Sequence, residues 1–83
     1  MTTAFQTDLT DKGYNGWSNY ETWNVSLWIQ NDEGLYNACR RMSDYQQVVN
    51  LMREVGSKET PDGVQWNSKK INRIELNEML EDL

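Results

Sequence analysis

The fold rests first on residues 44–56, Asp44-Tyr45-Gln46-Gln47-Val48-Val49-Asn50-Leu51-Met52-Arg53-Glu54-Val55-Gly56. The apolar side chains of this segment recur at i, i+3, i+4, i+7 and i+10, which is the spacing of one face of an α-helix. They are Tyr45, Val48, Val49, Met52 and Val55. Gly56 stands where a capping glycine is expected, and Ser43 or Asp44 begins the segment. The pattern predicts an amphipathic helix whose apolar stripe faces a core.

A second helix is predicted to begin at Ser18, ahead of the densest run of aromatic residues. Ser18 and Glu21 have the spacing of a capping box, so Ser18 is predicted to accept the backbone N–H of Glu21. The side chains with helical spacing are Tyr20, Trp23 and Leu27, then Asn24 and Trp28, with Val25 and Ile29 widening the stripe. Apolar alternation over 23–29 leaves a strand as the alternative, which the capping box and the length disfavour.

A short helix is predicted between these two segments, with Asn31 or Asp32 as its cap. Its apolar positions again have helical spacing, at Leu35, Ala38, Cys39 and Met42. Ser43 is only a weak break. Whether residues 35–42 and 43–56 form one kinked helix or two therefore stays open.

The C-terminal part begins with an irregular connection at 57–70. Thr60-Pro61-Asp62-Gly63 is a turn sequence, because proline presets φ at its second position and glycine accepts a positive φ. Two alternating apolar residues beyond it are predicted to point inward, Val64 and Trp66. Asn72 is predicted to cap a last helix, with Glu75 completing the capping geometry. The apolar residues of that helix are Leu76, Met79, Leu80 and Leu83, and Ile71 is predicted to pack on Leu76 from in front of the cap.

These elements predict an all-α fold of three or four helices over 17–83, preceded by a flexible polar arm at 1–16 in which Phe5 or Leu9 is the docking residue. A chain of 83 residues and 9.8 kDa has room for one small domain. Aliphatic residues are scarce, so the four Trp and four Tyr residues are predicted to fill the core.

Several classes of chemistry lack the residues that they need. The chain has no histidine, which excludes Ser-His-Asp and Cys-His nucleophile systems and histidine-ligated metals. One cysteine cannot form a cysteine-rich metal site, and no glycine-rich phosphate loop is present. We therefore predict no catalytic, cofactor-binding or metal-binding residues. A small enzyme that uses the carboxylates of Glu21, Asp32 or Glu33 is the least favoured alternative.

Charge and cysteine content bear on partners and compartment. The net charge is −5, which disfavours a generic coat on nucleic acid or on an anionic membrane. No run of 18 apolar residues exists to span a bilayer, and the first residues lack the features of a signal peptide. The lone Cys39 suits a reducing compartment. The predicted location is the cytoplasm.

The stretch Asn19-Tyr20-Glu21-Thr22-Trp23-Asn24-Val25, with its continuation to Gly34, resembles a family of small uncharacterised proteins. Tailed bacteriophages, notably those of cyanobacteria, and some mobile elements carry them. The likeness extends to 62–66 and 71–83, and so covers most of 17–83. The resemblance implies a phage-borne accessory protein in a host cytoplasm, and it implies no reaction.

The candidate site surrounds the start of the first helix. One interpretation is structural: Tyr20 and Trp23 face the core, and the four tryptophans fill it. In the functional interpretation, exposed aromatic and polar groups bind a host or viral protein. The residues predicted to bind the partner are Trp17, Asn19, Glu21, Asn24 and Trp28. A homodimer that buries a tryptophan-bearing face is a further alternative. The predicted function is a non-enzymatic interaction module.

Nucleic-acid binding is the second functional alternative. All but one of the eight Lys and Arg residues lie between positions 40 and 73. The predicted phosphate-binding residues are Arg40, Arg41, Lys69, Lys70 and Arg73. The plainer interpretation is that these cations are solvated or pair with the acidic ends of the chain.

Overall fold

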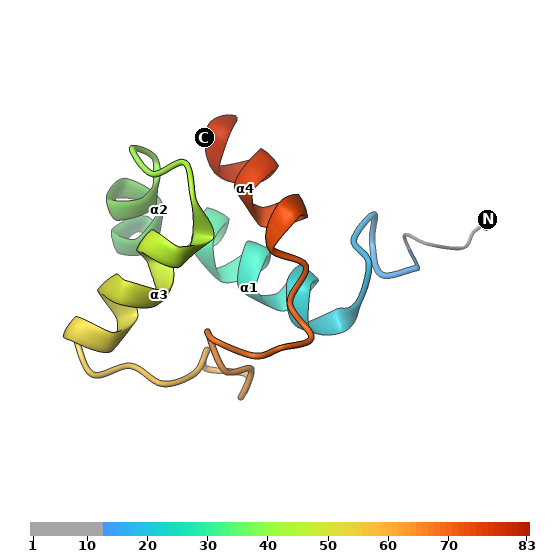
Figure 1. Ribbon diagram of the computed structural model, residues 1–83, viewed down its shortest axis with the longest axis horizontal. Coiled ribbons are helices and arrows are strands. Elements are labelled where there is room, and N and C mark those ends of the chain that lie inside the picture. The colour runs from blue at the N-terminus through green and yellow to red at the C-terminus, as the bar shows by residue number, and fades with distance from the viewer. Residues whose placement is uncertain (1–12) are drawn as a thin grey trace.

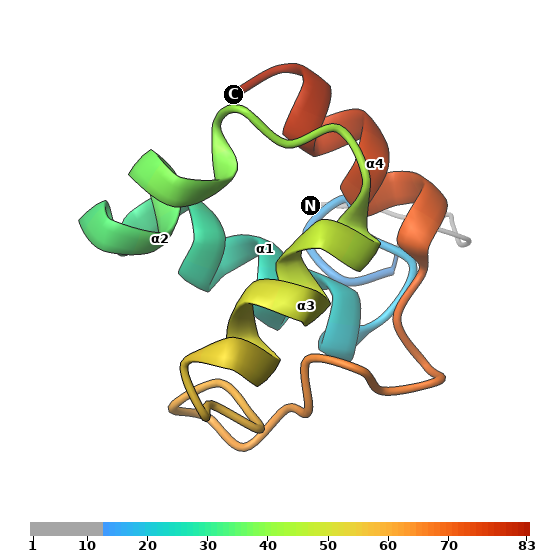
Figure 2. The same ribbon diagram turned by 60° about the vertical axis from the view of Figure 1, so that its left-hand side comes forward.

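The computed structural model describes residues 13–83, and within that range it contains four helices and no strand. The helices are α1 (Tyr20–Asn31), α2 (Glu33–Cys39), α3 (Tyr45–Glu54) and α4 (Arg73–Glu81). The helix α1 packs against both α2 and α4, and α3 packs against α4 (Figures 1 and 2). The connection from α3 to α4 runs along one edge of the molecule, past α1 (Figure 1). The predicted all-α class is confirmed.

The boundaries of α2 and α3 follow local capping chemistry. Asp32 has extended backbone angles and ends α1, and its carboxylate accepts the N–H of Leu35 at 3.0 Å to begin α2. Asp44 and Gln47 form a complete capping box at the start of α3. Residues 40–44 separate the two helices, which answers the question that the sequence left open.

The end of α3 is a Schellman motif built on Gly56. This residue has φ +79° and donates its N–H to the carbonyl of Arg53, while Ser57 donates to the carbonyl of Met52. The predicted capping glycine is confirmed. Val55 was predicted to continue the buried stripe, and that prediction is wrong, because α3 ends at Glu54 and the side chain of Val55 is 64% exposed.

The predicted start of α1 is also wrong. Asn19, not Ser18, is the N-cap, and its side-chain oxygen accepts the N–H of Thr22 at 2.9 Å. The reason is tertiary: the N–H of Ser18 donates to the Glu75 carboxylate at 3.0 Å, which fixes Ser18 against α4. Glu21 takes no part in a capping box.

At the start of α4 the predicted cap is confirmed, since Asn72 accepts the N–H of Glu75 at 3.2 Å. The reciprocal half of the predicted capping geometry is absent. The Glu75 carboxylate binds Ser18 instead, and the N–H of Asn72 donates to the Thr22 hydroxyl at 2.8 Å. Both exchanges hold the first turn of α4 against the first turn of α1.

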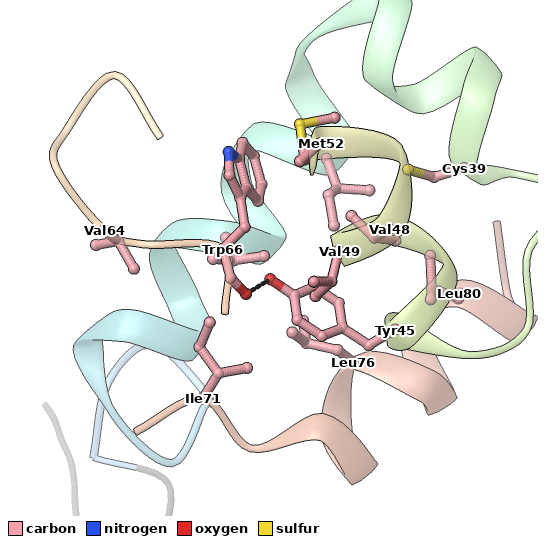
Figure 3. Close-up of a cluster of buried hydrophobic side chains, with 12 residues drawn as sticks. Cys39, Tyr45, Val48, Val49, Met52, Val64, Trp66, Ile71, Leu76 and Leu80 are labelled. Carbon is pink, nitrogen blue, oxygen red and sulfur yellow. Dashed lines mark hydrogen bonds between the residues drawn. The ribbon is translucent and has the colours of Figure 1, made fainter. Parts of the chain in front are cut away.

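The buried core draws side chains from all four helices and from the α3–α4 connection (Figure 3). It consists of Val25, Ile29, Cys39, Tyr45, Val48, Val49, Met52, Val64, Trp66, Ile71, Leu76 and Leu80. The turn at 60–63 is confirmed by a bond from the N–H of Gly63 to the carbonyl of Thr60 at 2.8 Å and by φ +91° at Gly63. Val64 and Trp66 point inward as predicted.

The buried face of α1 differs from the prediction. The helix buries mostly small side chains: Thr22, Asn24, Val25, Ser26 and Ile29. Tyr20 and Trp23, predicted to face the core, are only half-buried. Because α1 packs against two helices, small side chains occupy its inner face. Of the four tryptophans, Trp66 is buried in the core, and Trp17 and Trp28 are half-buried and pack against it. The prediction that all four fill the core is therefore wrong for Trp23, which lies outside it.

Candidate functional site

A two-residue hairpin turn precedes α1. The N–H of Tyr14 donates to the carbonyl of Trp17 at 3.0 Å, and the N–H of Trp17 donates back at 2.8 Å. Asn15 and Gly16 between them have φ 52° and φ 90°, the left-handed values of a type I′ turn. Asn-Gly is a strong hairpin signal, but the sequence interpretation assigned 13–16 to the flexible arm. Residues 1–12 of that predicted arm lie outside the described residues.

The hairpin brings Tyr14 onto two side chains of α1. The ring centroids of Tyr14 and Tyr20 are 5.3 Å apart with an interplanar angle of 71°, and those of Tyr14 and Trp23 are 5.1 Å apart. Tyr20 and Trp23 are 5.7 Å apart. We call these three residues the aromatic cluster. Tyr14 is 39% exposed, and Trp23 lies outside the buried core. The cluster thus has one exposed ring, Tyr14, and two half-buried rings.

A second group of contacts fastens α1 to the 60–63 turn, and we call it the polar clamp. One carboxylate oxygen of Asp62 accepts both the Asn24 amide at 2.8 Å and the Trp28 indole N–H at 2.9 Å. The side-chain oxygen of Asn24 accepts the Thr60 hydroxyl at 2.7 Å. The hydrogen bond from Asn24 and, to a smaller extent, the one from Trp28 favour the charged carboxylate. They hold the pKa of Asp62 below its ordinary value.

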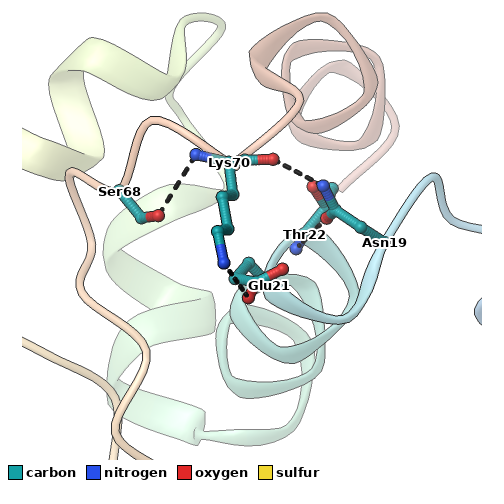
Figure 4. Close-up of polar contacts among 5 residues, drawn as sticks. All are labelled: Asn19, Glu21, Thr22, Ser68 and Lys70. Atoms are coloured by element: carbon teal, nitrogen blue, oxygen red, sulfur yellow. Dashed lines mark hydrogen bonds and ion pairs between the residues drawn. The ribbon is translucent and has the colours of Figure 1, made fainter.

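Asn19 and Glu21 are engaged with Lys70 (Figure 4). The Asn19 amide donates to the backbone carbonyl of Lys70 at 2.6 Å, and the Lys70 ammonium lies 3.9 Å from the Glu21 carboxylate. Ser68 orients the same segment by accepting the N–H of Lys70 at 3.2 Å. These contacts place the segment before α4 beside the first turn of α1.

An open pocket of about 430 Å³ lies between the hairpin, the end of α1 and one face of α4, and we call it the acidic pocket. It is lined by Gly16, Trp17, Gln30, Glu75, Glu78, Met79, Asp82 and Leu83. Glu75 is buried and accepts the N–H of Ser18, whereas Glu78 and Asp82 are exposed. The side chain of Gln30 donates to the Met79 sulfur at 3.1 Å.

The five residues predicted to bind a partner therefore have different positions. Asn24 and Trp28 belong to the polar clamp, and Asn19 and Glu21 contact Lys70. Trp17 is half-buried and lines the acidic pocket. Sequence reasoning missed the aromatic cluster, although the Asn-Gly dipeptide before Trp17 was a usable signal for the turn that builds it.

The five cations of the nucleic-acid alternative do not form one group. The segment after α2, which carries Arg40 and Arg41, lies well away from the segment before α4, which carries Lys69 and Lys70 (Figures 1 and 2). The Arg73 guanidinium donates to Gln46 and to Asn67, each at 2.7 Å, and lies 5.4 Å from the centre of the Tyr45 ring. Phosphate binding by these residues stays a prediction.

Residues 13–83 contain one thiol, which is buried, and neither a metal-binding cluster nor a membrane-spanning helix. Burial raises the pKa of the Cys39 thiol to about 11, which makes it a weak nucleophile at neutral pH. No three His, Cys, Asp or Glu side chains in this range gather in a way that could hold a metal ion. No helix in the same range has the length and apolar character to cross a membrane.

Fold and site together define a small all-α protein that has four helices within residues 13–83, with an aromatic cluster, a polar clamp and an acidic pocket around α1. The chain belongs to a family of unknown function, DUF7249, whose model matches residues 10–83. No curated protein and no solved structure matches it. The matched range contains all three features.

Proposed function

We propose that this protein is a non-enzymatic interaction module that binds a protein partner through the aromatic cluster. The observation that carries the proposal is the meeting of Tyr14, Tyr20 and Trp23 with ring centroids 5.1–5.7 Å apart, where Tyr14 is exposed, Trp23 is half-buried and Tyr20 packs against the edge of the core. Tyrosine and tryptophan are the side chains most enriched at binding hot spots, because each offers a large apolar area and a polar atom.

The cluster is held in place before any partner arrives. The type I′ turn fixes Tyr14, and the helical spacing of Tyr20 and Trp23 places their rings on one face of α1. Rigid aromatic side chains lose little conformational entropy on binding, so more of the contact energy appears as affinity. The polar clamp supports this rigidity, because it fixes α1 to the turn at 60–63.

The net charge and the family resemblance together indicate which class of protein the partner belongs to. A net charge of −5 favours a partner with a basic surface, because complementary charge speeds association and suppresses wrong partners. The resemblance of the stretch at 19–25 to phage-borne proteins supports a host or viral protein in a bacterial cytoplasm as that partner. We therefore propose a basic bacterial or phage protein as the binding partner.

Site-specific photo-crosslinking tests the proposal. A benzoyl-phenylalanine in place of Tyr14 keeps an aromatic ring in the cluster, and the same group in place of Ile74, which is 71% exposed on α4, serves as the control. In bacterial lysate we expect position 14 to give one discrete crosslinked product that position 74 does not give. We expect this product to disappear when the substitution Trp23→Ala is introduced into the same chain. Circular dichroism checks that this variant is still folded.

Three outcomes would overturn the proposed function. They are no crosslinked product at position 14, the same product from positions 14 and 74, and a product that Trp23→Ala leaves unchanged in a folded chain. Each of them would mean that the aromatic cluster does not contact a protein partner.

A further inference from the structure

We infer that the acidic pocket receives the side chain of an arginine of the partner, an inference that rests on the proposed function. The pocket lies beside the hairpin that also carries Tyr14 of the aromatic cluster, since Tyr14 and Trp17 are joined across the two-residue turn. A partner segment seated on the cluster thus has the pocket within its immediate reach.

The pocket has an apolar lining and an acidic wall. Four of its residues lie on one face of α4, at the helical positions i, i+3, i+4 and i+7: Glu75, Glu78, Met79 and Asp82. The apolar part comes from Trp17, Met79 and Leu83, all of them half-buried. Trp17 and α4 are fixed relative to each other, because the adjacent N–H of Ser18 donates to Glu75.

Glu78 and Asp82 of this wall carry negative charge that the other residues of 13–83 do not neutralise. No Lys or Arg among residues 13–83 lines the pocket or pairs with Glu78 or Asp82. These two carboxylates are one helical turn apart on α4 and repel each other. A cation placed between them relieves that repulsion, so charge complementarity selects a basic occupant.

Arginine fits this lining better than lysine does. Its planar guanidinium stacks on an indole and donates to two carboxylates through its fork of N–H groups. Its methylene groups are apolar and match the surfaces of Met79 and Leu83. A lysine ammonium is a compact point charge that gains less from a flat ring.

Titration with a small probe tests the inference without the partner. The probe is acetyl-arginine-amide, and acetyl-citrulline-amide is its neutral isostere. The readout is the indole N–H resonance of Trp17 in the nuclear magnetic resonance spectrum of the full chain, assigned with Trp17→Phe. We expect the arginine probe to shift this resonance to saturation. We expect the citrulline probe to bind more weakly, by roughly tenfold at least.

Charge-matched variants separate the pocket from the overall charge. The double variant Glu78→Gln/Asp82→Asn removes the wall, and Glu54→Gln/Glu81→Gln removes the same charge from exposed positions outside the pocket. We expect the first pair to weaken the arginine probe by roughly tenfold and the second by less than about twofold. Equal weakening by both pairs, or equal binding of the two probes, would overturn the inference.

A second copy of this chain is the competing occupant. Shifts of the Trp17 resonance that depend on protein concentration without any probe would assign the pocket to self-association and overturn the arginine inference. The photo-crosslink at position 14 is measured independently of all these titrations. If the arginine probe does not shift the Trp17 resonance but the crosslink at position 14 forms, only the assignment of the pocket is overturned. If the probe binds but no crosslink forms, the proposed function is overturned.

Discussion

Asn24 carries the most connected polar side chain on the inner face of α1. It is 1% exposed. The nitrogen of its amide donates to the Asp62 carboxylate, and the oxygen of the same amide accepts from the Thr60 hydroxyl. A buried polar group is tolerated only when it is hydrogen-bonded, and this one is bonded at both ends. The second asparagine of the stretch at 19–25 therefore has a structural role within the chain.

Stability at acidic pH depends on Asp62. Hydrogen bonds from Asn24 and Trp28 lower the pKa of its carboxyl in the folded state, so its contribution is complete above the ordinary pKa of 3.8. That contribution is lost as the pH falls through 3.8 and then through the lower folded value. We expect the wild type to be more stable than Asp62→Asn at about pH 7, with the difference shrinking toward about pH 3.

Urea unfolding of both proteins at about pH 7, pH 5 and pH 3 measures this difference. Asp82→Asn is the matched control, because the Asp82 carboxylate accepts no hydrogen bond within residues 13–83. A difference between wild type and Asp62→Asn that stays constant over the three pH values would contradict the assignment of the clamp to the charged carboxylate.

At the scale of the elements, the helix ends show where local chemistry prevails and where it does not. The caps of α2 and α3 use side chains within four residues, and the sequence predicts them. At α1 the sequence predicts Ser18 as the cap, but a contact with α4 engages the backbone of Ser18, and the adjacent Asn19 is the cap. Propensity alone does not rank a serine against an asparagine at this position.

Alanine substitution distinguishes the two caps. Asn19→Ala removes the acceptor for the N–H of Thr22 and the donor to the carbonyl of Lys70, so we expect a loss of about 1–2 kcal/mol in the free energy of unfolding. Ser18→Ala removes only an acceptor for the exposed Asn72 amide, and we expect a loss below about 0.5 kcal/mol. Chemical denaturation measures both, and the reverse order would restore Ser18 as the cap.

At the scale of the whole molecule, the long α3–α4 connection is part of the core rather than a loose link. It contributes three buried apolar side chains, Val64, Trp66 and Ile71, and it supplies the partners of the polar clamp. The Trp66 indole donates to Ser57 at 3.0 Å, and the Trp66 carbonyl accepts the Tyr45 hydroxyl. The irregular backbone is thus held by side chains from α1 and α3.

Tyr45→Phe tests how much this connection contributes. The substitution keeps the ring and removes the hydroxyl that bonds the Trp66 carbonyl in the buried interior, so we expect a loss of about 1–3 kcal/mol. Tyr36→Phe on α2 is the control, because the half-buried Tyr36 hydroxyl has no hydrogen bond within residues 13–83. Thermal and urea unfolding measure both variants, and equal stability of the two would contradict the proposed anchor.

The sequence by itself determined the helices, most of their caps, the turn at 60–63 and the inward side chains of 64 and 66. These features depend on periodicity and on hydrogen bonds between near neighbours, which a single sequence displays. It also placed the candidate site at the start of α1, and its partner-binding residues there stay predictions. It gave no sign that Asn24 and Trp28 both donate to Asp62, because the two side chains look like free polar and aromatic groups until residue 62 is placed beside them.

Only the tertiary structure decided which face of α1 is buried and which aromatic rings stay at the surface. The clamp joins residues 34 to 38 positions apart, and the bond between Ser18 and Glu75 spans 57 positions. No local pattern encodes such pairings, because their partners become neighbours only when helices pack. The same packing placed Trp17 over α4 and so created the acidic pocket.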